Sequence, residues 1–419
     1  MTEQKKTEKE TKTAKNNSLR SMILQNGLLP VLAVFTGLVI GGIVIIISND
    51  VAITAWENFF QNPFAAIVAS WNAVINGYGA LFAGALGKPG NMISGFQTYL
   101  ATGDNKELLN AFYPFTESLT TATPYIFAGL AVAIGFRCGL FNIGAEGQFF
   151  MGALGSAYIG YAITGLPAFI HLPLAILGGA AAGAIWGAIP GYLKAKFGAH
   201  EVVNTIMMNW IAFRLSDWLL KGPMKATGYR PVTPNIEATA ELPRFFPEPL
   251  RFNWGFILAL VVAWLVYWFL FKTTLGFEIR AVGANPDAAK YAGMNIIRNF
   301  VLVMTLSGAL AGMAGAAQVL GTDHWVGQGF SAGYGFDAIA LALLGKSHPL
   351  GVVLAGLLFG ILRGGATTMQ SLAGVPIDII SIVQGLVIIF VAAPAIIRWI
   401  YRLRIAHTDE TVLTRGWGR

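Results

Sequence analysis

The polar residues best placed to handle a solute lie in one short stretch, Phe136 to Gln148, between two apolar blocks. A carboxylate in the middle of a membrane costs about 2.5–3.5 kcal/mol, so it is rarely placed there without a function. Several glycines in this stretch would let a helix unwind, and the freed backbone groups must then face a protein cavity or water. We therefore predict a broken helix that lines a solute path. Its candidate residues are Phe141, Asn142, Glu146 and Gln148.

The carboxylate of Glu146 also has a purely structural interpretation. It could pair with Arg137, or it could cap the start of a helix at the membrane interface. Both alternatives place the charge near the end of a helix, whereas the path hypothesis places it beside a solute.

Three more polar residues lie within or at the start of later apolar blocks: Asn204, Asn209 and Asp337. The two amides could bind a polar solute or simply join neighbouring helices. Asp337 could line the same path, or it could offset the dipole at the start of a short helix. All three are kept as candidate path residues.

Motifs for ATP hydrolysis, ester hydrolysis or metal binding are incomplete. Gly329 to Gly333 spells the nucleophile-elbow pattern, but that motif needs a strand before it. Gly345-Lys-Ser347 resembles a phosphate loop, yet Ala340 stands where the first glycine belongs. His200 begins a zinc-helix pattern that has Asn204 in place of the second histidine. We expect no metal, no bound cofactor and no ATP hydrolysis site in this chain.

The composition indicates the elements that must position these residues. Of 419 residues only 12% are charged, against about 25% in soluble domains, and 55% are hydrophobic. The apolar residues come in long blocks, so the chain is predicted to be one all-α polytopic membrane unit. The single cysteine, Cys138, excludes disulfides within the chain. The net charge is +7, but the sequence contains no basic stripe with interleaved aromatic residues, so no nucleic-acid partner is expected.

Ten membrane spans are predicted. Residues 1–27 are polar and are expected to form a disordered tail. Residues 28–48 carry no charge and would measure about 31 Å as a helix, which is enough for the first span. Residues 49–119 are interpreted as an extracytoplasmic interfacial helix or a packed loop region, without a span. The nine later spans are 120–136, 139–165, 171–192, 203–220, 253–271, 299–320, 334–345, 350–364 and 375–399.

The basic residues predict the orientation of these spans. Both tails, residues 1–27 and 401–419, are rich in Lys and Arg, so both termini are expected in the cytoplasm, with a transmembrane domain over 28–400. Ten spans divide into two inverted repeats of five, a common transporter architecture. Several blocks are short or interrupted by glycine, which is typical of broken helices that line a cavity.

A charged stretch expected in the cytoplasm, Thr274 to Asn295, is the candidate for contact with a partner. Its helical core starts at Pro286, because proline is favoured at the first position of a helix. Gly276 and Gly293 are expected to supply turns. Without a phosphate loop, active transport would need an ion gradient or a partner ATPase, and a short exposed helix could dock in that partner's groove. An ordinary interfacial helix is the alternative.

Over residues 112–400 the chain resembles the permease subunits of ATP-binding-cassette importers that serve ribose, other sugars, branched-chain amino acids and nucleosides. The resemblance is closest to the nucleoside type. The segments that carry it are Gly139–Gln148, Glu201–Asn209, Leu275–Asn295, Gly335–Gly345 with Pro349–Gly351, and Gln384–Phe390.

The resemblance implies a bacterial cytoplasmic-membrane importer with several partners. These are a second permease subunit in a heterodimer, cytoplasmic ATPases that hold the ATP, and an extracytoplasmic substrate-binding lipoprotein. It also implies that the Asn142 region lies at a central cavity and that residues 280–293 dock the ATPase. The docking residues are Arg280, Asn285, Ala288, Ala289, Tyr291 and Gly293.

Two other functions remain open from the residues alone. One is an ion-driven carrier, whose uptake would survive depletion of ATP. The other is an intramembrane serine hydrolase that uses Ser331 with His324 or His348.

Overall fold

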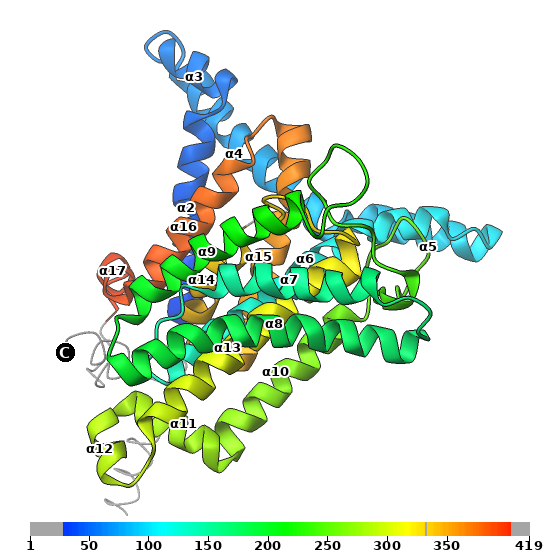
Figure 1. Cartoon of the computed structure of the whole chain (residues 1–419). Helices are drawn as coiled ribbons and strands as arrows, with labels where there is room; N and C mark the ends of the chain where they lie inside the picture. The colour runs from blue at the N-terminus through cyan, green and yellow to red at the C-terminus, as the bar shows by residue number, and fades with distance from the viewer. Residues whose placement is uncertain (1–27, 332, 404–419) are drawn as a thin grey trace, which may run out of the picture. The chain divides into compact units, whose positions relative to one another are not determined.

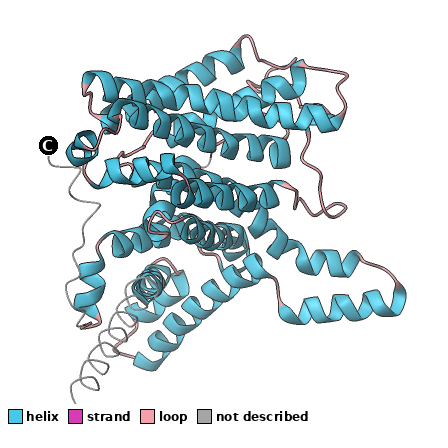
Figure 2. Ribbon diagram, turned by 90° about the horizontal axis from the view of Figure 1, so that it is seen from below, coloured by secondary structure: helices cyan, strands magenta, loops and turns pink. Residues whose placement is uncertain are grey.

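The computed structural model describes residues 28–331 and 333–403, which fold into helices joined by loops (Figures 1 and 2). No strand occurs among these residues, so the all-α class is confirmed. The predicted tails, 1–27 and most of 401–419, lie outside the described residues. The helices are α2 (Leu29–Ile47), α3 (Asp50–Glu57), α4 (Pro63–Leu86), α5 (Pro89–Thr102), α6 (Lys106–Arg137), α7 (Ala145–Ala162), α8 (Ala168–Phe197), α9 (Glu201–Lys221), η2 (Ala238–Ala240), α10 (Gly255–Lys272), α11 (Thr274–Ala284), α12 (Pro286–Tyr291), α13 (Ile296–Gln318), η3 (Val319–Asp323), α14 (Tyr334–Leu344), α15 (Pro349–Ala373), α16 (Asp378–Ala392) and α17 (Pro394–Ile400).

Seven helical segments of the described chain are long and apolar enough to cross a membrane: α2, α4 with α5, α6, α8, α10, α13 with η3, and α15. The number becomes eight if α16 and α17, which are bent by 88° at Ala393, form one broken span. The predicted ten spans are therefore not confirmed, and the inverted repeat stays a prediction.

Four segments explain the changed count: α4 with α5 is a candidate span that was not expected, whereas α7, α9 and α14 are not among the candidate spans of the described chain. Pro63 to Leu86 was not expected to span, because asparagines and glycines interrupt its apolar run, yet it forms one continuous helix. Asn72 and Asn76 lie on its exposed face, so they do not break it. Conversely, α14 has 11 residues and is about 16 Å long, which is too short for the roughly 30 Å hydrocarbon layer. The predicted span at 334–345 is a half-length helix.

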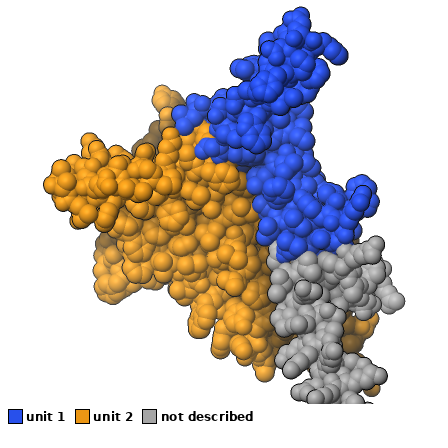
Figure 3. Space-filling model, turned by 180° about the vertical axis from the view of Figure 1, so that it is seen from behind, with its two compact units in different colours: residues 1–79, 369–411 blue, residues 80–368, 412–419 orange. Residues whose placement is uncertain are grey.

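The described chain divides into two compact units, one of residues 28–79 and 369–403 and the other of residues 80–368 (Figure 3). In the first unit α2 packs on α16, where Gly37 lies against Val387. Tyr78 of α4 donates a hydrogen bond to the Leu38 carbonyl of α2 (2.5 Å). The predicted first span is thus a helix held by other parts of its unit.

The core of the second unit is built on α13, which packs closely on α6, α7 and α8 (Figure 1). Glycine permits the closest of these approaches. A Cβ at Gly312 of α13 would lie 3.1 Å from the Gly183 Cα of α8, and one at Gly187 of α8 would lie 2.9 Å from Gly308 Cα. Such small-residue contacts let backbones meet in lipid, where hydrophobic burial gives no driving force between helices.

Residues 49–119 are helical rather than looped. Trp56 of α3 donates to the Ser70 hydroxyl of α4 (2.9 Å), and Thr98 of α5 donates to Glu107 of α6 (2.8 Å). These contacts close two helical hairpins, one in each unit. Of the two interpretations of this segment, the packed loop region is wrong, and the helices that replace it include a candidate span, Pro63–Thr102, where none was expected.

Candidate functional site

Asn142 lies in the loop between α6 and α7 and is fully buried. Its Nδ2 donates to Gln148 Oε1 and to Ser307 Oγ, both at 2.8 Å, and its Oδ1 accepts from the Gly144 amide at 2.9 Å. The structure therefore brings Asn142 and Gln148 together, but as partners of each other. Phe141, beside them, is half-buried and packs on Phe136.

Asn209 extends the same set of contacts from α9. Its Oδ1 accepts from the Gly147 amide (2.8 Å) and its Nδ2 donates to the Ile143 carbonyl (3.0 Å). This geometry agrees with the interpretation that the Asn209 amide joins neighbouring helices. We call Asn142, Gln148, Asn209 and Ser307 the amide network. Asn204, one turn earlier on α9, has a buried Nδ2 without a partner among the described residues.

Glu146 points from α7 toward the start of α14. Its Oε1 accepts from Ser331 Oγ (2.5 Å) and its Oε2 accepts from the Gly335 amide (2.7 Å). The carboxylate thus caps α14, a helix almost 190 residues away in sequence. Gly335 is needed for this approach, since a Cβ there would lie 2.6 Å from the Ala145 carbonyl carbon. The alternative pairing with Arg137 is not found in the described structure, where Arg137 binds the carbonyls of Lys346 and Ser347.

Asp337, two residues after Gly335 on α14, joins a second polar cluster. Tyr125 of α6 donates to Asp337 Oδ2 (2.9 Å), and Arg363 of α15 donates to Tyr125 Oη (3.0 Å). Arg363 also forms an ion pair with Asp337 at 3.6 Å. Neither Tyr125 nor Arg363 was among the predicted residues, although Arg363 is the only charged residue in the apolar stretch that forms α15.

Aromatic rings pack next to these two polar groups. Tyr334 at the start of α14 stacks on Phe149, with centroids 5.6 Å apart, and Phe149 stacks on Phe330 at 5.4 Å. Arg363 lies over the Tyr334 ring. Carboxylates, a hydroxyl and aromatic faces together can bind hydroxyl groups and a flat ring. We call this set the α14 site: Tyr125, Glu146, Phe149, Phe330, Ser331, Tyr334, Asp337 and Arg363.

The predicted partner-contact stretch forms two helices, α11 and α12. As predicted, α12 begins at Pro286, and Asn285 caps it by accepting from the Ala288 amide (3.1 Å). Gly293 has φ 84° and ends the segment with a turn. Gly276, in contrast, lies inside α11, where a Cβ would meet the Leu270 backbone at 2.7 Å. Its expected role in a turn is wrong.

The side chains of α12 differ in exposure. Tyr291 is 97% exposed and Ala288 is also exposed, whereas Ala289 is buried. Arg280 of α11 places its guanidinium 5.1 Å from the centre of the Phe271 ring. The exposed surface of α12 therefore combines Ala288 with the charged Asp287 and Lys290 beside Tyr291.

Comparison with known proteins identifies the family of this chain. The family model described as "branched-chain amino acid transport system / permease component" matches residues 115–392. The chain belongs to this permease family. The predicted resemblance over 112–400 is confirmed, and the chain is a polytopic membrane protein.

Named relatives of this permease come from bacteria and an archaeon. The guanosine ABC transporter permease protein NupP of Bacillus subtilis is 38% identical over 90% of this chain and 96% of its own length. The nucleoside ABC transporter permease protein NupB of Lactococcus lactis is 36% identical over 67% and 79%, respectively. The glucose ABC transporter permease protein TsgB13 of Haloferax volcanii is 37% identical over 72% and 81%. No solved structure matches the chain.

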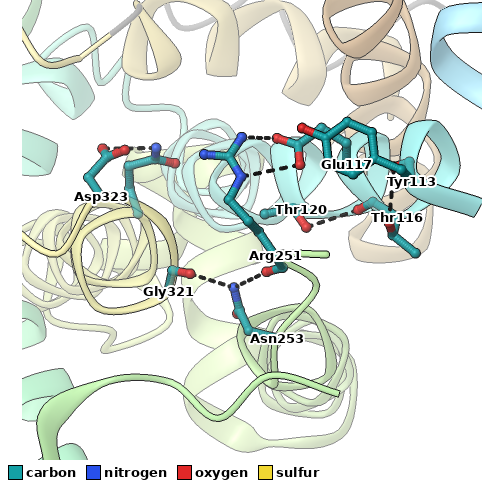
Figure 4. A network of polar contacts seen from close by, with 9 residues as sticks. Tyr113, Thr116, Glu117, Thr120, Arg251, Asn253, Gly321 and Asp323 are labelled. Atoms are coloured by element: carbon teal, nitrogen blue, oxygen red, sulfur yellow. Dashed lines mark hydrogen bonds and ion pairs between the residues drawn. The ribbon is translucent and has the colours of Figure 1, made fainter. Parts of the chain in front are cut away.

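A further polar network joins α6, the segment before α10, and η3 in this permease (Figure 4). Glu117 of α6 forms an ion pair with Arg251, and the Arg251 carbonyl accepts from Asn253 Nδ2 (3.0 Å). The same Nδ2 donates to the Gly321 carbonyl (2.9 Å). These contacts fix the segment that leads from α13 toward α14, so they support the α14 site from one side.

The serine-hydrolase hypothesis finds no support in the geometry. Ser331 donates to Glu146, while His324 lies near Glu241 and Arg244. His348 lies on the turn after α14 and packs on Tyr267 and Phe271. Neither histidine is recorded as a hydrogen-bond partner of Ser331 among the described residues, so no nucleophile–base pair is formed.

Proposed function

We propose that this permease is the membrane subunit of an ATP-binding-cassette importer that carries a nucleoside into the cell. The observation that carries this proposal is the 38% identity with a guanosine permease along almost the whole of both chains. The α14 site fits such a solute, because a nucleoside combines sugar hydroxyls with a flat heterocycle. Stacking on aromatic rings and hydrogen bonds to carboxylates suit those two parts.

Energy for the import comes from a partner ATPase that docks on α11 and α12. The incomplete phosphate motif supports this division, since ATP is then bound by the partner and this chain needs no cofactor of its own. The exposed Tyr291 and Ala288 offer contact surface, and Arg280, Asn285, Ala289 and Gly293 hold the shape of the two helices. Alternating access then moves the solute past α14.

The rest of the assembly follows from the same proposal. A second permease subunit completes a heterodimer, and a substrate-binding lipoprotein delivers the solute from outside the cytoplasmic membrane. Both termini lie in the cytoplasm, because the basic tails favour that side. Within the path, Glu146 and Asp337 contact the solute, while Asn142, Gln148 and Asn209 hold the surrounding helices.

The solute is tested by uptake of labelled guanosine into proteoliposomes that contain the permease with its partner subunits. We expect guanosine uptake only when ATP is present on the side of the membrane that carries the ATPase. An excess of unlabelled nucleosides should suppress this uptake. Ribose, glucose and leucine should not compete. Competition by a sugar or by leucine alone would reject the nucleoside assignment, and uptake that survives ATP depletion would favour the ion-driven carrier.

Docking is tested by Ala288→Asp, which places a charge on the exposed face of α12. We expect the ATPase to be lost from the purified complex while the permease remains in the membrane. Ala238→Asp is the matched control, because Ala238 is also an exposed alanine in a short helix, η2. Retention of the ATPase in the Ala288→Asp complex would contradict the docking site.

A further inference from the structure

Arg137, the last residue of α6, holds the turn between α14 and α15. Its Nε donates to the Ser347 carbonyl (2.8 Å) and its Nη2 donates to the Lys346 carbonyl (3.2 Å). Lys346 and Ser347 both have positive φ, 51° and 50°. Residues other than glycine rarely adopt that conformation, so the surrounding structure must maintain it. Arg137 binds the carbonyls of these two residues directly.

The guanidinium of Arg137 also packs on Phe271 near the end of α10, 5.4 Å from the ring centre. Arg280 of α11 packs on the same ring at 5.1 Å. His348, which ends the strained turn, lies against Phe271 as well, with centroids 5.4 Å apart. One phenyl ring therefore contacts the proposed docking helix, the end of α6 and the turn after α14.

The backbone of α11 meets α6 at the same place. A Cβ at Gly283 would lie 2.9 Å from the carbonyl carbon of Cys138, the residue after Arg137. With glycine at this position, α11 is seated directly on the end of α6. A displacement of α11 must therefore displace the end of α6, Phe271, or both.

The other end of α14 reaches the α14 site. Gly335 binds Glu146 and Asp337 binds Tyr125, whereas the turn held by Arg137 follows Leu344 at the far end. Because α14 is a single short helix of 11 residues, a shift of the turn moves the polar contacts at its start. The α14 helix thus connects the Arg137 contacts to the proposed solute site.

We propose that Arg137 is a positioning residue that transmits movement of the ATPase-docking helices to α14. The proposal rests on the proposed function, since it assumes that α11 and α12 receive the ATPase. Lysine cannot replace this arginine, because the guanidinium uses two donors on two carbonyls while its flat face stacks on Phe271. A lysine has a single ammonium group, which cannot make both carbonyl hydrogen bonds and the stacking contact with Phe271 together.

The test is Arg137→Lys in the complete importer in proteoliposomes, with ATP hydrolysis and guanosine uptake measured on the same sample. We expect the ATPase to co-purify as in the wild type and ATP to be hydrolysed. The guanosine imported per ATP should fall by about tenfold, a typical size for coupling between two sites. Arg298→Lys is the control, because Arg298 is an exposed arginine at the start of α13, and its ratio should not change.

A second variant, Phe271→Leu, keeps the hydrogen bonds of Arg137 but removes the ring that it shares with Arg280. It should lower the same ratio without loss of the ATPase. A wild-type ratio in both variants would overturn the proposal. Loss of the ATPase from both complexes would also overturn it, because Arg137 would then belong to the docking surface. Failure of the proposed function is recognised separately, by a wild-type complex that does not retain an ATPase or does not import guanosine.

Discussion

The amide network and the α14 site are neighbours along the chain, but they use polar groups in opposite ways. Asn142, Gln148, Asn209 and Ser307 are almost completely buried, and their hydrogen bonds go to one another or to the backbone. At the α14 site Glu146 and Tyr125 are equally buried, but the Asp337 and Arg363 side chains stay 25% and 34% exposed. Polar residues in the membrane region therefore include both fully buried, helix-joining groups and the partly exposed pair of Asp337 and Arg363.

The chemistry of the side chains explains this difference between amides and carboxylates. An amide has both donors and an acceptor, so a few amides can satisfy one another and close a network. A carboxylate only accepts, and at the α14 site its partners are a hydroxyl, a backbone amide and a guanidinium.

Asn142→Leu should have the largest effect, and it should act on stability. The substitution leaves Gln148 and the Gly144 amide without their partner, at about 1–3 kcal/mol for each unpaired buried group, while Ser307 keeps its bond to the Ala131 carbonyl. We expect a large fall in the unfolding temperature of the detergent-solubilised complex and little folded protein. Normal stability with weaker guanosine binding would place Asn142 in the solute site. It would contradict the assignment of the amide network to helix packing.

Asp337→Asn should have the next largest effect, and it should act on transport. The amide keeps an acceptor for Tyr125, but it removes the ion pair with Arg363, which is partly exposed and contributes at most about 1 kcal/mol to stability. We expect guanosine affinity to fall about tenfold, or about 1.4 kcal/mol, with an unchanged unfolding temperature.

Asp217→Asn is the control for that variant, since Asp217 of α9 accepts a hydrogen bond from Gln328 (2.8 Å), which is not a residue of the α14 site. Equal transport by both variants would remove Asp337 from the path.

Ser331→Ala should have a smaller effect of the same kind. It removes the hydroxyl that donates to Glu146, while the Gly335 amide remains. The loss of one hydrogen bond predicts a threefold to roughly tenfold fall in guanosine affinity, measured by uptake at increasing guanosine concentration. Complete loss of an ester-cleaving activity in this variant would instead support the hydrolase.

The smallest expected effect concerns acid sensitivity at the other end of α14. The pKa of His348 is lowered from 6.5, because burial disfavours its charged form and Arg137 repels it. The unfolded chain then binds the proton more readily than the folded one, so stability falls as the pH drops through about 6.5. His348→Gln should lessen this fall, measured as unfolding temperatures between about pH 7.5 and about pH 5.5. The same pH dependence in both proteins would exclude this contribution.

Much of the helical framework could be predicted from the sequence, because long apolar runs have few alternatives in a membrane. Residues 28–48, 253–271 and 299–320 lie within a few residues of α2, α10 and α13. The α4 helix was missed, since its asparagines lie on an exposed face that a one-dimensional pattern cannot reveal. The predicted block 334–345 matches the bounds of α14, but it was interpreted as a span although 11 residues are too few to cross the hydrocarbon layer.

The candidate site was predictable only in part. The stretch around Glu146 stands out because it is polar, and Asp337 stands out because it begins an apolar block. Their partners do not, since Tyr125 and Arg363 lie 212 and 26 positions from Asp337 in the chain. The roles of Asn142 and Glu146 could not be separated from the sequence, because both are polar residues in the same short stretch. Their different hydrogen-bond partners are visible only in the structure.

The most direct test of the central claim, that a nucleoside binds at the α14 site, is protection of a Ser331→Cys variant from thiol alkylation. The chain has one native cysteine, Cys138, which is buried, so the wild type should stay unmodified. In an assembled importer that still takes up guanosine, we predict that guanosine slows alkylation at 331 and that glucose does not. An alkylation rate that guanosine leaves unchanged would contradict the claim.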